Sequence, residues 1–271
     1  MKIFLFGKDG MLGTYINVYL KQYYEIVSFN RNDFDVLKND RIFLEKLLEK
    51  NNINSDCLII NSIGLIPQRK DNNIENYVLI NSYFPRILDQ ISEKYSCKYI
   101  QISTNCVFSG KNPLSNESNF PDPSDIYGLS KYLGETSRAT IIRTSIIGEE
   151  LKTSISLLSW VLKNNNKHID GYTNHYWNGV TCLELSKYIK TIIERNMYWI
   201  GVRHIQSENI VSKYDLIKQI IEIYNLDIVV NKIEHTESNY RTLNSNFNTI
   251  YKIPSIYQQI YEQKYFILNN I

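Results

Sequence analysis

Hydrophobic and polar positions divide the first half of the chain into short apolar runs and segments with helical spacing. The runs at 2–6, 25–29, 57–61 and 98–102 are too short for helices and are typical of strands buried on both faces. Between them, apolar residues recur every three or four positions, which predicts helices. Strands that alternate with helices indicate a parallel sheet, so we predict an α/β, Rossmann-type doubly wound fold.

The expected helix over residues 72–94 contains one interruption. Pro85 lies inside it, and we expect this residue to kink the helix or to mark a boundary because proline lacks a backbone N–H. After the strand at 141–147 and the turn at Gly148, the pattern becomes looser. We therefore expect a Rossmann domain in residues 1–150.

Residues 151–271 are expected to form mainly a smaller α/β lobe, with part of the chain returning to the first domain. Helices are predicted over 183–195 and 214–224, with a strand at 200–205 between them. Thr181, followed three residues later by Glu184, has the form of a capping box at the start of the first of these helices.

Composition narrows the class of protein without identifying its chemistry. The 271 residues are 43% hydrophobic, which is ordinary for a globular chain, and no apolar stretch reaches the ~18 residues of a membrane span. The net charge is +2 with Lys and Arg spread along the chain, so neither a nucleic-acid nor a membrane partner is indicated. The four cysteines form no C-x-x-C pair, which predicts no metal site, no disulfide framework and a reduced, cytoplasmic compartment.

Three glycines follow the first apolar run directly. Gly7, Gly10 and Gly13 lie between the expected strand and a helix, which is the setting that a dinucleotide-binding turn requires. Such glycines allow a tight turn, a close approach of the backbone to a pyrophosphate and close packing of helix on strand. A G-x-x-G-x-x-G turn can also be purely structural, but its position favours nucleotide binding.

The ends of the next two strands refine this prediction. The second strand runs into Asn30 and Arg31 with no acid at its tip, which favours the 2′-phosphate of NADP over the ribose of NAD. A solvated loop arginine is the alternative. The third strand ends at Asn61, followed by Ser62 and Gly64, which we expect to lie against the cofactor because the carboxyl ends of strands line the crevice.

Candidate catalytic residues follow the fourth strand. Thr104, Asn105 and Cys106 form a polar group at its carboxyl end, and a long loop from 108 to 125 comes next. Tyr127 and Lys131 are four residues apart, so they share one face of a helix. A nearby ammonium stabilises a phenolate and moves the tyrosine pKa from about 10 toward neutrality.

These motifs together resemble the extended short-chain dehydrogenases/reductases, and within them the dTDP-4-dehydrorhamnose reductase family of sugar-nucleotide enzymes. The resemblance extends over nearly the whole chain and is carried by four motifs: Gly7-x-x-Gly10-x-x-Gly13, Ser103 to Gly110, Tyr127-Gly128-x-Ser130-Lys131-x-x-Gly134-Glu135, and Arg143 to Gly148. It implies reduction of a nucleotide-activated 4-keto-6-deoxyhexose with NADP(H), or with NAD(H) as the other choice. Many members are homodimers, which is the assembly that the resemblance implies.

The resemblance also assigns roles to residues. Tyr127 would donate a proton to the carbonyl oxygen, Lys131 would tune Tyr127 and bind the nicotinamide ribose, and Thr104 would orient the carbonyl. The cofactor would contact Gly7, Gly10, Met11, Leu12, Gly13, Asn30, Arg31, Asn61, Ser62 and Gly64. The substrate would contact Asn105, Cys106, Tyr172, Trp177 and Arg241. For the aromatic segment at 171–179, a packed surface loop is an equal alternative.

The pair after Thr104 departs from close relatives. Nucleotide-sugar 4,6-dehydratases carry Asp-Glu there and the 4-dehydrorhamnose reductases typically carry Asp-Tyr, whereas this chain has Asn105-Cys106. Cys106 instead matches a proton-exchanging cysteine of GDP-fucose synthase and of plant 3,5-epimerase/4-reductases, which makes an epimerase–reductase, or a plain epimerase, one alternative. A cysteine that only packs in the core is also compatible with the sequence. Epimerase–reductases of this kind need a second acid or base, a His or Lys, which residues 154–159 do not contain. Lys152 and Lys163 lie off the expected position. A non-catalytic NADP-binding regulatory subunit is the other alternative.

Overall fold

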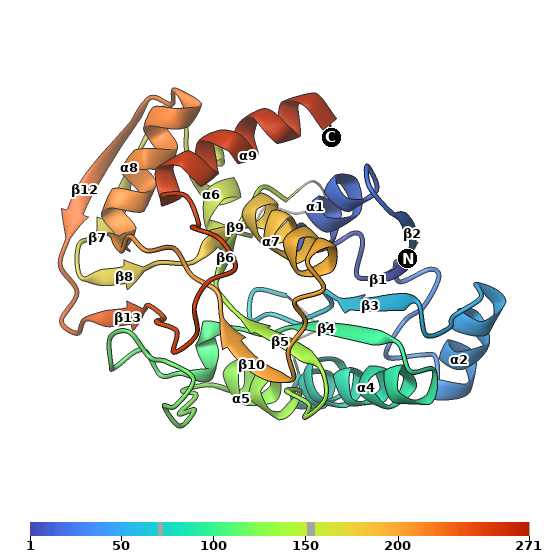
Figure 1. The fold of residues 1–271 in the computed structure, drawn as a ribbon. Helices are drawn as coiled ribbons and strands as arrows, with labels where there is room; N and C mark the ends of the chain where they lie inside the picture. The colour runs from blue at the N-terminus through green and yellow to red at the C-terminus, as the bar shows by residue number, and fades with distance from the viewer. Residues whose placement is uncertain (70–72, 151–154, 271) are drawn as a thin grey trace.

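The centre of the molecule is a six-stranded parallel sheet in the order β10-β5-β4-β3-β1-β2 (Figure 1). The computed structural model describes residues 1–69, 73–150 and 155–270. The strands are β1 (Lys2–Phe6), β2 (Glu25–Phe29), β3 (Cys57–Asn61), β4 (Lys98–Ile102), β5 (Thr140–Arg143) and β10 (Gly201–His204). The predicted doubly wound α/β fold is confirmed.

Helices cover both faces of this sheet, as the continuous apolar runs of its strands require. In Figure 1, α1 (Met11–Leu20) and α7 (Cys182–Glu194) lie on one side, and α2 (Arg41–Lys50), α4 (Phe84–Lys94) and α5 (Ile126–Leu133) lie on the other. Successive side chains of a strand point to opposite faces. Ile3 and Leu5 therefore pack with α1 and α7, whereas Phe4 and Phe6 pack with α2 and α4.

Pro85 marks a boundary, as predicted. The segment that was expected to be one helix consists of α3 (Ile74–Tyr77), a π-helical stretch (Val78–Tyr83) and α4, and the first part of the expected range lies outside the described residues. Pro85 occupies the first turn of α4. Its missing N–H would break a continuing α-helical ladder, and the change of helical register occurs immediately before it.

The second half of the chain contributes both to this sheet and to a separate lobe. α7 packs against α1, and β10 adds to the sheet edge beside β5. The lobe at the left of Figure 1 has its own apolar core, which includes Leu158, Ile217 and Ile260. Its elements are β6 (Ile146–Ile147), α6 (Leu157–Lys163), β7 (Lys167–Tyr172), β8 (His175–Trp177), β9 (Val180–Thr181), β11 (Val211–Ser212), α8 (Lys213–Tyr224), β12 (Ile228–Ile233), β13 (Asn239–Arg241) and α9 (Ile256–Asn270).

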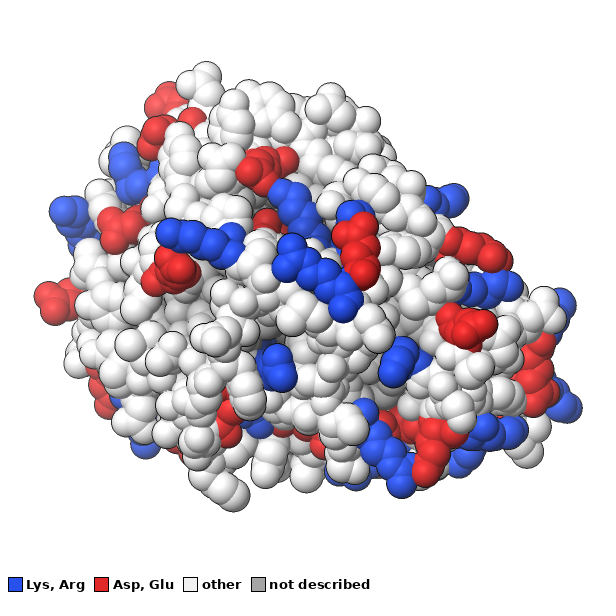
Figure 2. All heavy atoms as spheres, viewed as in Figure 1, with Lys and Arg blue, Asp and Glu red and all other residues white. Residues whose placement is uncertain are grey.

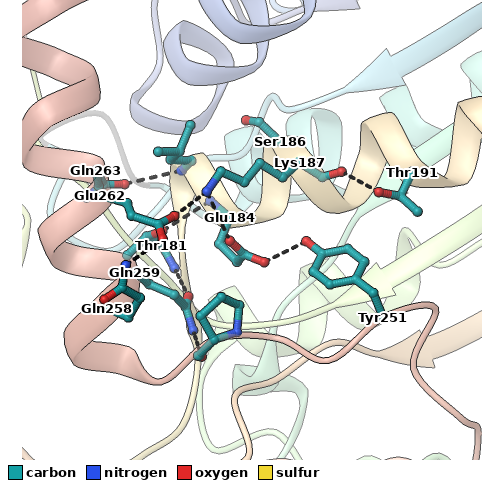
Figure 3. A network of polar contacts seen from close by, with 12 residues as sticks. Thr181, Glu184, Ser186, Lys187, Thr191, Tyr251, Gln258, Gln259, Glu262 and Gln263 are labelled. Atoms are coloured by element: carbon teal, nitrogen blue, oxygen red, sulfur yellow. Dashed lines mark hydrogen bonds and ion pairs between the residues drawn. The ribbon is translucent and has the colours of Figure 1, made fainter.

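A polar network joins α7 to α9 (Figure 3). Thr181 caps α7 by accepting a hydrogen bond from the Glu184 N–H (3.1 Å), as a capping box predicts. The returning half of the box is replaced, because Gln259 of α9 accepts the Thr181 N–H (3.0 Å). The Glu184 carboxylate turns instead to the Tyr251 hydroxyl (2.6 Å) and to Lys187, which also pairs with Glu262. The cap therefore becomes a link between two helices.

The charged surface is mixed. Figure 2 shows Lys and Arg side chains interspersed with Asp and Glu side chains over the face in view. Within the described part of the chain, no helix combines the length and the apolar character needed to cross a membrane.

Candidate active site

A cleft of about 340 Å³ opens at the carboxyl ends of β1, β2 and β3. The chain leaves β1 for one face of the sheet and β3 for the other, and ligands of doubly wound folds bind at such a switch point. Seven of the ten residues predicted to contact a cofactor through the glycine turn or the strand ends line it: Gly7, Gly10, Met11, Asn30, Arg31, Ser62 and Gly64.

The glycine turn has the shape that close packing of α1 demands. Gly7 adopts a φ of +91°, which disfavours any residue with a side chain. A Cβ on Gly13 would lie 1.9 Å from the Gly7 carbonyl oxygen. Gly10 is the N-cap of α1 and offers no side-chain cap, so the first-turn N–H groups remain available to an anion in the cleft. These residues fit a dinucleotide pyrophosphate.

The remaining predicted cofactor contacts of this region lie behind the cleft. Leu12 is buried in the core between α1 and the sheet. Gly13 packs against the turn itself. Asn61 is fully buried, donates to the Gln101 side chain (2.9 Å) and accepts from the Ile63 N–H (3.0 Å). These three residues shape the cleft from within and do not line it.

The tip of β2 carries an acid that the sequence pattern did not reveal. Asp33, four residues beyond the strand end, folds back so that its carboxylate accepts the Asn30 N–H (2.9 Å) and pairs with Lys8 (3.3 Å). The Asn30 N–H, more than any other contact, lowers the pKa of Asp33, and Lys8 adds to this. Arg31 is exposed and has no acidic partner within the described residues. A cation thus faces the cleft while the nearby acid is already paired.

Thr104, Cys106, Tyr127 and Lys131 gather at the carboxyl end of β4. Thr104 caps a 3₁₀ turn, Asn105–Val107, by accepting the Cys106 N–H (3.1 Å). Tyr127 lies close enough to Thr104 and Cys106 for both to shift its pKa. Lys131 is buried and donates to the Ile102 carbonyl (2.7 Å), the last residue of β4. The four predicted catalytic residues are therefore neighbours.

Gly128 makes this approach possible. A Cβ at this position would lie 2.1 Å from the Cys106 carbonyl oxygen, so any side chain would push α5 away from the 3₁₀ turn. The Asp125 carboxylate caps α5 at the Gly128 N–H (2.7 Å) and fixes the start of the helix. The Tyr-Gly pair thus places the hydroxyl of Tyr127 beside Thr104.

Burial shapes the ionisation of both helix residues. The pKa of Tyr127 is raised, and not lowered toward neutrality as the lysine spacing predicted. Burial, and then the neighbouring Cys106, raise it, whereas the Thr104 hydroxyl lowers it. Burial lowers the pKa of Lys131 to about 8, and Glu135 acts in the opposite direction. Near neutral pH, Tyr127 is therefore a neutral phenol that can give a proton, and Lys131 remains mostly an ammonium ion.

A buried ion pair behind these residues had no role in the sequence analysis. The carboxylate of Glu135 binds the Arg143 guanidinium through two hydrogen bonds (2.7 and 2.6 Å) and the Ser103 hydroxyl through a third (2.6 Å). Both residues belong to the motifs quoted above. The four-residue spacing of Lys131 and Glu135 was the available signal, but Arg143 is brought in only by the pairing of β5 with β4.

The predicted substrate contacts divide into two groups. Asn105 and Arg241 meet at the catalytic turn, because Asn105 donates to the Arg241 carbonyl (3.0 Å) and Arg241 donates to the Phe108 carbonyl (2.8 Å). Trp177 is half-buried and donates to Ser145 (2.8 Å).

Tyr172 belongs to another cluster. It packs against the rings of His175 (centroids 4.5 Å apart) and His235 (5.8 Å) in the second lobe. The charge of Arg241 contributes to the lowered pKa of His175, after burial, His235 and Lys213. Arg241 thus lies between this cluster and the catalytic turn.

Comparisons with known proteins agree with this architecture. The family model described as RmlD substrate binding domain matches residues 1–248. The fold matches a dTDP-4-dehydrorhamnose reductase from Clostridium acetobutylicum with a TM-score of 0.81 at 21% identity, covering 99% of this chain and 100% of that chain. The same enzyme from Bacillus anthracis, in complex with NADP, matches with a TM-score of 0.82 at 20% identity and covers 99% of each chain.

A UDP-glucuronic acid 4-epimerase from Bacillus cereus, in complex with UDP-glucuronic acid and NAD, has a TM-score of 0.74 at 16% identity, with 99% of each chain covered. At such identities these likenesses concern the fold. No curated protein matches this chain in sequence.

Proposed function

The chain belongs to the RmlD substrate binding domain family, and from this premise we propose that it reduces a nucleotide-activated 4-keto-6-deoxyhexose with NADPH. It is an NAD(P)-dependent oxidoreductase of the extended short-chain dehydrogenase/reductase type. The observation that carries the proposal is the group of buried Thr104 and Lys131 and half-buried Tyr127 at the end of β4, beside a glycine-lined cleft.

The residues of the cleft fit a dinucleotide. The backbone at Gly7, Gly10 and Met11 would hold the pyrophosphate at the N-terminus of α1, and Lys131 would hold the nicotinamide ribose. Arg31 would bind a 2′-phosphate through its forked donors. When bound, NADPH supplies the hydride.

The chain supplies the proton. Tyr127 donates its hydroxyl proton to the carbonyl oxygen as the alcohol forms, and its raised pKa keeps that proton in place beforehand. The Lys131 ammonium stabilises the phenolate left behind. Thr104 donates a hydrogen bond to the same carbonyl oxygen and fixes its direction. On the substrate side, Asn105, Cys106 and Arg241 are near enough to this centre to hold the sugar, with Trp177 and Tyr172 further along the second lobe.

A panel assay tests the proposal. Protein purified without added cofactor is mixed with NADPH and a series of nucleotide 4-keto-6-deoxy sugars in deuterated water. We expect loss of absorbance at the reduced-nicotinamide band with one member of the panel. Tight NADPH binding without oxidation by any sugar would contradict the reductase and favour a regulatory, non-catalytic subunit.

Cys106 supports a second candidate, an epimerase–reductase. Its thiol is half-buried and close enough to raise the pKa of Tyr127. A thiol beside the reacting carbonyl could exchange a proton at the neighbouring carbon. Of the two lysines near the expected second acid or base, Lys163 is the last residue of α6 and Lys152 lies outside the described residues. Deuterium at C3 or C5 of the product would favour this candidate, and its absence would favour the plain reductase.

The choice of cofactor depends on Arg31 in this proposal. We expect Arg31→Ala to raise the KM for NADPH about tenfold, since a charge-assisted hydrogen bond contributes about 1.5–3 kcal/mol. The KM for NADH should change little. Arg41→Ala on α2, which removes an exposed ion pair with Glu45, is the control and should leave both constants unchanged. An equal rise for NADPH and NADH would contradict a 2′-phosphate contact.

A further inference from the structure

We propose that Glu135 is a positioning residue for proton transfer, which holds the end of β4 in place and sets the electrostatic surroundings of Lys131. The inference rests on the proposed reductase function. It assigns a task to a carboxylate that would not itself touch substrate or cofactor.

Glu135 contacts the end of β4. Three consecutive residues at the end of this strand serve the site. The Ile102 carbonyl accepts from Lys131 (2.7 Å), the Ser103 hydroxyl donates to Glu135 (2.6 Å), and Thr104 faces Tyr127. Glu135 therefore holds the residue between the acceptor of Lys131 and the hydroxyl that would orient the carbonyl.

The carboxylate of Glu135 is held rigidly. Glu135 and Arg143 are each 5% exposed and form a forked pair with both carboxylate oxygens engaged. The Arg143 guanidinium is also held from the other side by the Phe108 ring (5.4 Å) and by Nε2 of His204 (3.4 Å). A buried forked pair of this kind has a single geometry, so Ser103 is tied to a fixed point.

His204 completes this packing as a neutral ring. Its Nδ1 faces the carbonyl oxygens of Asn244 (2.8 Å) and Ser115 (3.2 Å) and so carries the hydrogen. Its Nε2 is then a free acceptor for Arg143. Burial lowers the pKa of His204, which agrees with a neutral ring. The charge of Arg143 is therefore balanced by Glu135 alone in this cluster.

The charge of Glu135 also acts on Lys131. Burial disfavours the ammonium form of Lys131, and the charge of Glu135 favours it. Other titratable groups around this helix are Tyr127 and Tyr132 on α5, Asp125 at its N-cap, Tyr77 on α3, Arg86 on α4, Cys106 on the 3₁₀ turn, Arg143 on β5 and His204 on β10. Among the described residues, Glu135 is the one whose charge supports the protonated lysine.

Glu135 acts on Lys131 without binding it. The described residues include no ion pair between the two side chains, because Lys131 donates to Ile102 and the carboxylate is held by Arg143 and Ser103. The ammonium therefore keeps its remaining hydrogens for the roles that the proposed function gives it, toward the Tyr127 phenolate and a bound ribose. A direct pair would favour the charge equally well but would turn the ammonium away from them.

The test compares Glu135→Gln, Glu135→Asp and the double variant Glu135→Gln/Arg143→Gln by the pH dependence of kcat/KM. We expect the alkaline limb to move down by about one pH unit in Glu135→Gln, since an opposite charge nearby shifts a pKa by about 1–3 units. The aspartate variant should restore most of that limb. The double variant leaves no unpaired arginine, so it guards against poor folding of the single variant. Because it also removes the opposing charge of Arg143, its downward shift should be smaller than that of Glu135→Gln.

Two controls separate charge from structure. Ser103→Ala removes only the hydrogen bond and should lower kcat several-fold with the alkaline limb unchanged. In the second control, Lys131 is titrated directly by NMR of carbon-labelled lysine side chains without any ligand, with Lys131→Met to assign the signal. An unchanged alkaline limb and an unchanged Lys131 titration in a folded Glu135→Gln or double variant would overturn the proposal.

The NMR titration also separates this inference from the proposed function. If no keto-sugar is reduced, the reductase proposal fails, while a lower Lys131 pKa in the Glu135 variants still supports the electrostatic role of Glu135.

Discussion

The end of β4 and the α7–α9 network contain similar residues but differ in how their lysine is paired. Both contain a lysine, at least one glutamate and a tyrosine. The side chains of Lys131 and Glu135 are buried, whereas those of Lys187 and Glu262 are each about 30% exposed. In the α7–α9 network, Lys187 pairs with two carboxylates, Glu184 and Glu262, and Tyr251 satisfies Glu184 as well. At the end of β4, Lys131 donates a hydrogen bond to one backbone carbonyl, and the nearby carboxylate of Glu135 is bound to Arg143.

The difference teaches how a buried lysine remains available for chemistry. Lys187 is paired with Glu184 and Glu262 and links α7 to α9. Lys131 has no direct carboxylate partner among the described residues, and burial lowers its pKa to about 8. In the proposed function its ammonium is then free to stabilise the Tyr127 phenolate. The composition of a polar cluster is therefore a poor guide to its role, and the distribution of its hydrogen bonds is a better one.

Removing the proton donor should break the site most severely. We expect Tyr127→Phe to lower kcat by about 10²–10⁴-fold, the usual contribution of general acid–base catalysis. The dissociation constant for NADPH should change little, because the ring is retained and the other cofactor contacts are intact. Stopped-flow oxidation of NADPH and fluorescence titration measure the two quantities. Tyr83→Phe, at an exposed tyrosine, is the control, and near-normal turnover of Tyr127→Phe would exclude this assignment.

Forcing α5 away from the 3₁₀ turn should have the next largest effect. In Gly128→Ala the new Cβ would lie 2.1 Å from the Cys106 carbonyl, a backbone atom that cannot turn aside. We expect kcat to fall about 10²-fold because a displacement of about 1 Å misaligns Tyr127 and Thr104.

The same substitution should lower the free energy of unfolding by about 1–3 kcal/mol, the usual cost of overpacking. Urea denaturation measures this, and Leu129→Ala at the exposed neighbour provides the control. Stability lost without any loss of kcat would mean that the spacing of α5 and the 3₁₀ turn does not matter to the chemistry.

Changing Lys187 should affect stability alone. We expect Lys187→Met to lower the free energy of unfolding by about 1 kcal/mol at pH 7, because the buried Glu184 carboxylate loses one of its partners. The kcat should remain unchanged. Lys190→Met, which removes a surface pair with Glu194 on the same helix, should cost less. Reduced kcat in Lys187→Met would show that the two regions are coupled.

The pH dependence of this loss has a definite sign. Burial raises the pKa of Glu184 above 4.5 in the folded protein, and Lys187 opposes that rise. A carboxyl group whose pKa is raised by folding makes the folded protein less stable as the pH increases through that pKa. Lys187→Met should raise the pKa of Glu184 further. Glu262 adds to this effect. Pairing with Lys187 helps to lower the pKa of Glu262, so the pair stabilises the folded protein above about pH 4.5, and Lys187→Met loses that stability in the same pH range. The deficit should therefore be larger at pH 8 than near pH 5.

Sequence patterns predicted those parts of the site that lie close together in the chain. The turn at Gly7–Gly13 and the Tyr127–Lys131 spacing depend on local geometry, so their positions could be read directly. Leu12 and Asn61 show where this reasoning ends. Both belong to the right segments, but the rotation of a helix and the alternation of a strand turn their side chains into the core.

The sequence by itself determined the fold class and the carboxyl ends at which the polar residues gather, because strand length, helical period and glycine turns are local properties. Only the tertiary structure decided which charges balance one another. Asp33 folds back on Lys8, Glu135 after α5 meets Arg143 at the end of β5, and β10 pairs with β5 from about sixty residues further along the chain. These contacts depend on how separate elements pack, and their partners are chosen by burial and by the need to pair buried charges, which no local pattern records.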